Sequence, residues 1–243
     1  MLARDWYYHE RSKTRRDFVE SERAAICDIG QSPQDSEAHA YATLRALGVR
    51  PGWTVADIGC GAGVMACAAA DLGAAVHAID VSPSMLALAE LRAREQKLKI
   101  TTQSAGFLSF TYVPQSFDLI ISEFALHHLP DFWKAVALTR IFNALKPGGM
   151  LFLRDVVFHE MPDGGERSVE QWTDFILGNR PFSRDDVAVH MRDEHSTFGW
   201  VLERLLADAK FASIRAHYEA PVYGVYHAMK PALAAVPAEA SAG

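Results

Sequence analysis

A glycine-dense turn at Asp57–Gly63 limits most strongly what this chain can fold into. The turn follows an apolar segment, residues 53–56, that is typical of a buried strand. It precedes a run of small residues at 64–72 that predicts a helix. Such a turn between a parallel strand and a helix leaves backbone open to a ligand at the positive end of the helix. We therefore expect an α/β fold with a ligand site here.

A second carboxylate strengthens this expectation. Residues 74–80 predict another strand, and it ends at Asp80. A carboxylate about twenty residues beyond a glycine turn is placed to accept hydrogen bonds from ribose hydroxyls. The two features together predict a cofactor that contains adenosine.

Two cofactors compete for the turn. The run from Gly61 to Ala66 satisfies the dinucleotide fingerprint, which permits alanine at its last position. Asp57 argues against a dinucleotide, because its charge would repel a pyrophosphate placed beside the glycines. It suits S-adenosylmethionine instead, which carries a sulfonium and an ammonium and no phosphate. A nicotinamide-dependent dehydrogenase stays as the alternative enzyme.

Strands and helices alternate along most of the chain, which predicts a doubly wound, mostly parallel sheet. Ser82 and Pro83 form a helix start, with a capping hydroxyl followed by a residue that needs no amide partner. The expected helices are 36–47, 83–97 and 131–145, and the later expected strands are 99–103 and 150–158.

The alternation stops at residue 159. Residues 159–195 predict a helical insertion, with helices at 166–177 and 183–192, and insertions at this edge of a sheet cover the ligand crevice. A helix at 197–209 and an antiparallel pair, 211–219 and 222–229, follow. We thus expect an N-terminal lid or arm at 1–35, one domain at 36–230 and a flexible tail at 231–243.

Five segments in order resemble a known family. They are Asp57-Ile-Gly-Cys-Gly-Ala-Gly63, Asp80-Val-Ser-Pro-Ser-Met85, Phe117-Asp118-Leu-Ile-Ile-Ser122, Phe124-Ala-Leu-His-His-Leu-Pro-Asp131 and Leu145-Lys-Pro-Gly-Gly-Met150. The chain resembles class I S-adenosylmethionine-dependent methyltransferases, in particular small-molecule enzymes similar to the ubiquinone/menaquinone type. The resemblance covers about residues 36–155.

The resemblance implies a Rossmann-like sheet of seven strands with an antiparallel hairpin at its end, and S-adenosylmethionine as cofactor with S-adenosylhomocysteine as product. The cofactor-binding residues that it implies are Asp57, Gly59, Cys60, Gly61, Asp80, Val81, Met85, Ala105, Gly106, Phe107 and Ser122. One position departs from the family pattern. The third strand usually ends in an acid that faces adenine, and Ser104 stands near that place.

Methyl transfer depends mainly on alignment of the two reactants, and a base is needed only for a nucleophile with a proton of high pKa. His127 and His128 follow the fourth strand, near the expected position of the methyl group. Adjacent residues point apart, so at most one faces a substrate, and we favour His127. The alternative is that one caps a helix and the other packs. Neighbouring histidines rarely converge on one ion, so no metal is expected.

A second catalytic candidate is His195, within a titratable group that also contains His190 and residues 193–197. The structural alternative is that Ser196 caps a helix beginning at Thr197. His159 and Glu160 form a third possibility. For Arg154 and Asp155 we expect a structural ion pair.

Bulk properties narrow the substrate. With 30 acidic and 24 basic residues the net charge is −6, which disfavours nucleic acid as a partner. No apolar run reaches membrane-spanning length, and three cysteines without metal spacing favour a reducing, cytoplasmic location. We expect a small-molecule acceptor and, from the aromatic N-terminal arm, consider a homodimer. A non-catalytic cofactor-binding module is the other alternative, motivated by Ser104.

Overall fold

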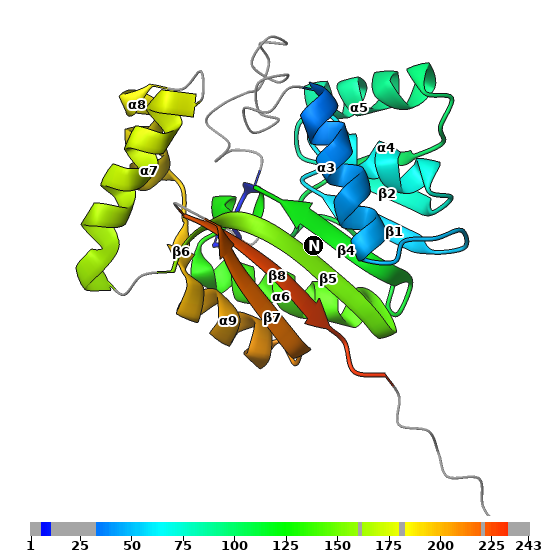
Figure 1. The fold of residues 1–243 in the computed structure, drawn as a ribbon. Helices are drawn as coiled ribbons and strands as arrows, with labels where there is room; N and C mark the ends of the chain where they lie inside the picture. The colour runs from blue at the N-terminus through cyan, green and yellow to red at the C-terminus, as the bar shows by residue number, and fades with distance from the viewer. Residues whose placement is uncertain (1–5, 11–32, 160–161, 180–182, 220–221, 233–243) are drawn as a thin grey trace, which may run out of the picture.

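A central, mostly parallel sheet organises the computed structural model, which describes residues 6–10, 33–159, 162–179, 183–219 and 222–232 (Figure 1). Its strand order is β3-β2-β1-β4-β5-β8-β7, and the short β6 pairs with β5. The strand bounds are Thr54–Ile58 (β1), Ala75–Asp80 (β2), Thr101–Ser104 (β3), Phe117–Glu123 (β4), Leu145–Phe158 (β5), Thr197–Phe198 (β6), Ala212–Glu219 (β7) and Tyr223–Met229 (β8).

The pairing confirms the expected fold class. Strand β1 pairs in parallel with β2 and with β4, and β4 pairs in parallel with β5. The last two strands form the predicted antiparallel ending, since β8 pairs antiparallel with both β5 and β7. A doubly wound dinucleotide domain has the order 3-2-1-4-5-6 instead, without an inserted antiparallel strand. The order reverses between β1 and β4, and ligands of such sheets bind at this point.

Helices cover both faces of the sheet (Figure 1). Their bounds are Pro33–Ala46 (α3), Val64–Asp71 (α4), Pro83–Glu95 (α5), Asp131–Ala144 (α6), Gly165–Asn179 (α7), Arg184–Asp193 (α8) and Gly199–Asp208 (α9), with short 3-10 turns at Leu126–His128 (η1) and Pro162–Gly164 (η2). The predicted start of α5 is confirmed, because Ser82 Oγ accepts the Met85 amide and Pro83 is its first residue.

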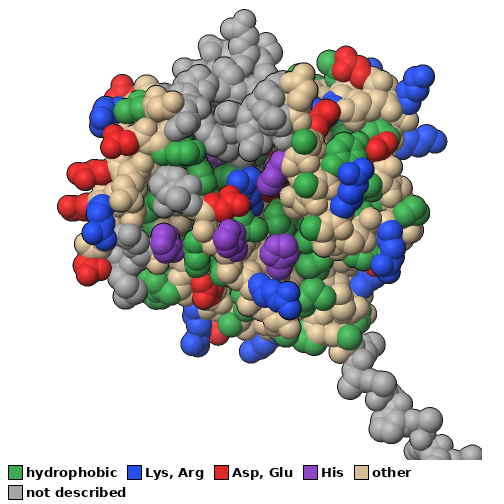
Figure 2. All heavy atoms as spheres, viewed as in Figure 1, with side chains coloured by type: hydrophobic (Ala, Val, Ile, Leu, Met, Phe, Trp, Pro, Cys, Tyr) green, Lys and Arg blue, Asp and Glu red, His purple; other side chains and the backbone are tan. Residues whose placement is uncertain are grey.

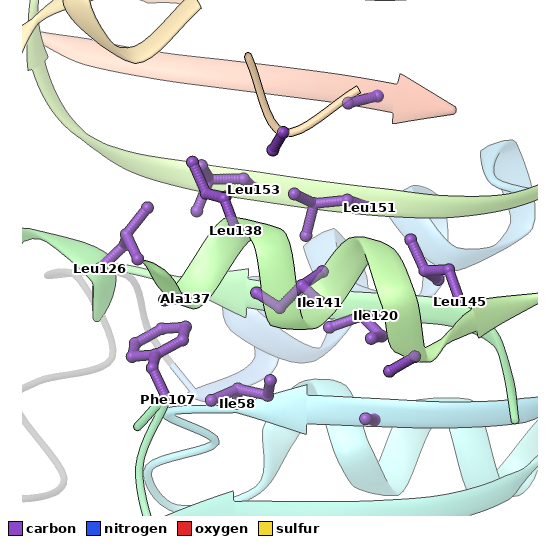
Figure 3. Packing of buried hydrophobic residues seen from close by; sticks show 14 of the residues in the cluster. Ile58, Phe107, Ile120, Leu126, Ala137, Leu138, Ile141, Leu145, Leu151 and Leu153 are labelled. Atoms are coloured by element: carbon purple, nitrogen blue, oxygen red, sulfur yellow. The ribbon is translucent and has the colours of Figure 1, made fainter. Parts of the chain in front are cut away.

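Two apolar cores hold the layers together. On one face, α3 and α4 pack on strands β1, β4 and β5 through side chains such as Leu44, Met65 and Ile121. On the other face, Leu138 and Ile141 of α6 meet Ile120 and Leu151 (Figure 3). Because each strand alternates its side chains between faces, β1 serves both cores. This double burial fixes the register of the strands and therefore the place where they end.

Helices α7 and α8 form in the segment for which two helices were expected, and they lie to one side of the sheet (Figure 1). Trp172, Ile176 and Val187 bury their side chains against Val156 and Tyr223 at the ends of β5 and β8. Ser183 caps α8 in a reciprocal capping box with Asp186. The insertion thus rests on the carboxyl end of β5, beside the point where β4 ends.

One helix boundary differs from the expectation. The segment predicted as a helix from Thr197 begins with strand β6, and α9 starts at Gly199. Phe198 occupies the N-cap position, without a side-chain cap. The proposed Ser196 cap is therefore wrong, because pairing of Thr197 with Val157 keeps this segment extended.

Candidate active site

The glycine turn forms a tight backbone cradle after β1. Gly59, Gly61 and Gly63 all have positive φ angles, a conformation that side chains disfavour. A Cβ on Gly59 would lie 2.3 Å from Ala125 Cβ, and one on Gly63 would lie 2.7 Å from Ala89 Cβ. A Cβ on Gly61 would meet nothing within 4 Å. Close packing therefore requires glycine at positions 59 and 63, whereas the space beside Gly61 is open.

Asp80 holds this cradle in place from the end of β2. Its Oδ2 accepts the amide of Gly61 at 2.9 Å, and its Oδ1 accepts the amide of Ser82 at 2.8 Å. Burial raises the pKa of Asp80, although these amides lower it. Each oxygen of the Asp80 carboxylate has a second lone pair, so it can accept a further hydrogen bond from a ribose hydroxyl.

Buried polar atoms without a hydrogen-bond partner gather at the carboxyl ends of β1, β4 and β5. Among the described residues they are Asp57 Oδ2, Ser122 Oγ, Glu123 Oε1 and Arg154 Nε. Burial, followed by the charges of Glu123 and Asp80, raises the pKa of Asp57 to about 8. Orphaned buried acceptors are costly, and they are common where a ligand completes the pairing. A cationic ligand with polar groups fits this set, and a pyrophosphate does not.

The other predicted cofactor residues line the same part of the fold. Cys60, Met85, Ala105 and Phe107 have buried side chains, whereas Val81 is only partly buried between β2 and α5. Ser104, the last residue of β3, pairs in register with Asp80. The departure from an acid at Ser104 therefore stands beside the predicted ribose site.

Residues 6–10 of the N-terminal arm lie against the loop after β3. Glu10 Oε2 accepts the amides of Leu108 and Ser109 at 3.0 and 3.1 Å, and its carboxylate lies where a Cβ on Gly106 would go. Tyr7 donates to the Leu108 carbonyl. These contacts place the arm against the loop that contains Gly106, one of the predicted cofactor residues. The rest of the predicted lid, residues 1–5 and 11–35, falls largely outside the described residues.

A buried imidazole–carboxylate pair stands next to the cradle. His127 of η1 and Asp155 of β5 lie with Nδ1 and Oδ1 2.5 Å apart, and both side chains are buried. Asp155 also accepts the amides of His127 and Val156 through its two oxygens. The carboxylate therefore fixes the imidazole's orientation and leaves Nε2 facing the other way.

The Nε2 side of His127 meets the insertion. Glu194 Oε2 lies 3.4 Å from His127 Nε2 and also contacts His190 Nδ1. The other ring nitrogen of His190, Nε2, lies 2.7 Å from Ser196 Oγ. The ring of His190 packs edge-on against Trp172. Three chain segments thus converge on one small polar cluster, which we call the His127–Glu194 cluster (His127, Asp155, His190, Glu194 and Ser196).

Charge and burial compete in this cluster. Burial disfavours charged His127, but Asp155 and then Glu194 outweigh it, so the pKa of His127 is raised. Burial opposes ionisation of Glu194, but His190 and His127 bring its pKa down to about 2. Burial and the neighbouring His127 lower the pKa of His128 to about 3. His128 is therefore neutral, and His127 is the more basic of the adjacent pair.

His195 contributes its backbone to the same cluster. Its amide donates to the His127 carbonyl at 2.8 Å, and its carbonyl accepts the ammonium of Lys134. Lys134 is buried and also binds Asp131 Oδ1 at 2.7 Å. These bonds fasten the insertion to η1 and α6. His159 and Glu160 were the third catalytic candidate predicted from the sequence. The ring of His159 stacks on Tyr218, and Glu160 lies outside the described residues.

The predicted ion pair between Arg154 and Asp155 is wrong. Neighbouring residues of a strand point to opposite faces of the sheet, so their side chains do not meet. Arg154 instead binds Glu219 at 2.7 Å, and Asp155 binds His127. Lys134 is a further structural residue, which no motif of the sequence predicted. Only its place near the start of α6 could have suggested a role.

Comparison with known proteins supports the family resemblance. Residues 55–149 match a family model described as a methyltransferase domain. The chain is 39% identical over 106 residues to phosphoethanolamine N-methyltransferase 2 of Caenorhabditis elegans, covering 43% of this chain and 24% of the relative. It is 40% identical over 106 residues to a ubiquinone biosynthesis O-methyltransferase of Xanthomonas campestris pv. campestris, covering 42% and 43%. The chain thus spans less than half the length of these curated relatives.

A solved structure extends the likeness of the fold. Haemonchus contortus phosphoethanolamine N-methyltransferase 2, in complex with S-adenosyl-L-methionine, aligns with a TM-score of 0.68 at 20% identity. The alignment covers 93% of this chain and 61% of that one. The matched domain and the fold are similar to those of S-adenosylmethionine-dependent methyltransferases, in agreement with the resemblance of the sequence motifs.

Proposed function

We propose that this chain binds S-adenosylmethionine and transfers its methyl group to a small-molecule acceptor, releasing S-adenosylhomocysteine. One observation carries the proposal: the unpaired polar atoms of Asp57 and Ser122 lie at the edge of the sheet from which η1 and the His127–Asp155 pair also emerge. The proposed cofactor site and an acid–base group therefore lie at the same edge of the sheet. The matched methyltransferase domain agrees with this arrangement.

The residues present fit the cofactor. Oδ2 of Asp57 has no hydrogen-bond partner and offers one to the cationic amino-acid end, and Asp80 offers acceptors to the ribose. The open side of Gly61 lets backbone approach the ligand closely. Glu10 and the loop at 105–109 stand where the third strand ends, and we assign them to the adenosine side. Adenine recognition then rests on backbone and on Ser104 rather than on an acid.

Bound S-adenosylmethionine supplies an electrophilic methyl group on a sulfonium. The acceptor's lone pair forms the new bond to carbon, the carbon–sulfur pair stays on sulfur, and the acceptor's proton leaves. We assign activation of the acceptor to Nε2 of His127, whose basicity Asp155 raises. His195 is the second proposed catalytic residue. In the free chain its backbone holds His127, and its imidazole is the next group to test.

Charge favours a small acceptor over nucleic acid. On the face shown in Figure 2, Lys and Arg side chains are dispersed and form no continuous basic patch. Among the described residues, no helix is both long and apolar enough to cross a membrane. A cytoplasmic location and a homodimer remain proposals that rest on cysteine usage and on the aromatic arm.

The test is release of S-adenosylhomocysteine by the purified full chain with a panel of phenols, catechols, amines and carboxylates. Release that depends on an acceptor supports methyl transfer. Loss of that release in His127→Ala supports a catalytic role for His127. Tight cofactor binding without release across the panel favours the non-catalytic module. NAD-dependent oxidation of an alcohol would revive the dehydrogenase.

A further inference from the structure

Three potential metal ligands converge on one point in the His127–Glu194 cluster. The nearest ligand atoms of His127, His190 and Glu194 all lie within 4.8 Å of one another. His127 comes from η1 after β4, His190 from the last turn of α8, and Glu194 from the residue that follows α8. We infer that these three residues form a binding site for one divalent transition-metal ion, at the acceptor side of the crevice.

The far nitrogen of each imidazole is already held by another group. His127 Nδ1 lies 2.5 Å from Asp155 Oδ1, and His190 Nε2 lies 2.7 Å from Ser196 Oγ. In both rings the remaining nitrogen, Nε2 of His127 and Nδ1 of His190, therefore faces Glu194. Metal-ligating histidines almost always donate their other ring N–H to a carboxylate, carbonyl or similar group. The cluster has this outer layer for both histidines.

The backbone beneath the cluster is fixed. His190 lies in the last turn of α8, and Glu194 is the C-cap of that helix, where its amide donates to the His190 carbonyl at 3.0 Å. The His195 amide donates to the His127 carbonyl, and buried Lys134 binds the His195 carbonyl. The ligands from α8 and η1 are thus joined by direct bonds between their own segments. Such support lets a site hold its ligands without a large ordering cost.

The donor set selects the kind of ion. Two imidazole nitrogens and one carboxylate suit Zn²⁺, Fe²⁺, Co²⁺ or Ni²⁺, whereas Mg²⁺ and Ca²⁺ prefer oxygen ligands. A site with three protein ligands keeps at least one position for water or substrate. The partial exposure of Glu194, 20%, leaves a side of the cluster accessible.

The role of this ion rests on the proposed function, whereas its binding does not. An ion held beside the acceptor would polarise an oxygen or nitrogen of that molecule and lower the pKa of its proton. With the ion bound, His127 Nε2 would be its ligand, and the acceptor's proton, made more acidic by the ion, would pass to water. Without the ion, Nε2 would take that proton as proposed above. The site thereby predicts acceptors with a hydroxyl or amine that can coordinate a metal.

Metal binding is tested on the full chain after chelator treatment, by calorimetric titration with Zn²⁺ and by absorption spectra with Co²⁺. We expect one equivalent bound with micromolar or tighter affinity, a rise in melting temperature, and Co²⁺ bands typical of a low-coordinate nitrogen/oxygen site. Glu194→Gln keeps the size of the side chain and should weaken binding at least tenfold. Ser196→Ala, which frees His190 Nε2, should weaken it about 10–100-fold.

His159→Ala is the matched control, because His159 stacks on Tyr218 outside the cluster and should leave metal affinity unchanged. Titration with S-adenosylhomocysteine, run in parallel, separates this proposal from the proposed function. Metal affinity lost in Glu194→Gln with unchanged affinity for S-adenosylhomocysteine supports the site. Absence of stoichiometric binding, or binding that survives in both Glu194→Gln and His190→Ala, would overturn it in favour of a metal-free acid–base cluster.

Discussion

Nδ1 of His127 and Oδ1 of Asp155 lie 2.5 Å apart in a buried pair that joins the end of β4 to the neighbouring strand β5. The strand order puts the cofactor cradle one strand away, at the end of β1. The acceptor activation and the cofactor binding that we propose therefore lie at one edge of the sheet, and single substitutions should separate them.

Replacement of His127 with alanine should lower turnover by roughly 10²–10⁴-fold if the side chain activates the acceptor. Affinity for S-adenosylhomocysteine should stay within about twofold, because His127 is outside the cradle. Single-turnover kinetics and calorimetry measure the two effects. His195→Ala is the comparison variant, and equal losses in both would place the acceptor nearer to His195.

Asp57→Asn should stabilise the free protein while weakening the cofactor complex. Burial beside Glu123 and Asp80 raises the pKa of Asp57 to about 8, above its ordinary value of 3.8. Between these values the folded state holds a proton that the unfolded state has lost, so Asp57 makes stability fall as pH rises. The melting temperature of Asp57→Asn should exceed that of the wild type by a margin that widens from pH 5 to pH 8.5.

The scale of this effect is about 2–4 °C for each kcal/mol in a chain of this size. Scanning fluorimetry across that pH range measures it. A margin that stays constant with pH would mean that Asp57 ionises normally. In calorimetry, an unchanged affinity for S-adenosylmethionine would remove Asp57 from the cofactor site.

Gly61→Ala and Gly48→Ala form a matched pair. Both glycines have positive φ, and a Cβ at either position would meet nothing within 4 Å of the protein. Each substitution should cost about 1–2 kcal/mol of backbone strain, seen as a similar drop in melting temperature. Only Gly61→Ala should weaken S-adenosylhomocysteine binding, by at least tenfold, because its methyl group enters the ligand's space. Equal affinities in the two variants would place the ligand elsewhere.

Glu10→Ala tests the arm as a cover for the cofactor. Glu10 accepts bonds from the amides of Leu108 and Ser109 and from the Ser109 hydroxyl. Removing the carboxylate leaves these donors unpaired, so the arm should detach and the cofactor should dissociate faster. Stopped-flow displacement of labelled S-adenosylhomocysteine measures the rate. A rate equal to that of the wild type would mean that the arm plays no part in retention.

Local patterns predicted the sheet well, because each signal lay within one segment. The glycines, the Ser82–Pro83 helix start and the apolar runs each specify a local conformation, and the strand order follows from right-handed parallel crossovers. Two apolar runs separated by a short turn also predicted the antiparallel pair of strands at the end of the sheet.

Only part of the His127–Glu194 cluster could be predicted from the sequence. His127, Asp155 and Glu194 come from three segments, and no local spacing indicates that they meet. The ion pair between Arg154 and Asp155 was predicted from their adjacency in sequence. That prediction was wrong because the side chains of neighbouring strand residues point to opposite faces of the sheet. Ser196 was assigned to a helix cap on composition alone, but pairing of the next residue with β5 turned its hydroxyl toward His190.

The central claim is that the glycine turn holds S-adenosylmethionine, and calorimetric titration of the purified chain tests it most directly. S-adenosylmethionine, S-adenosylhomocysteine and NAD should be titrated in parallel. We predict one site with micromolar affinity for both adenosyl ligands and no heat with NAD. Saturable binding of NAD with none of the adenosyl ligands would contradict the account, starting with the role given to Asp57.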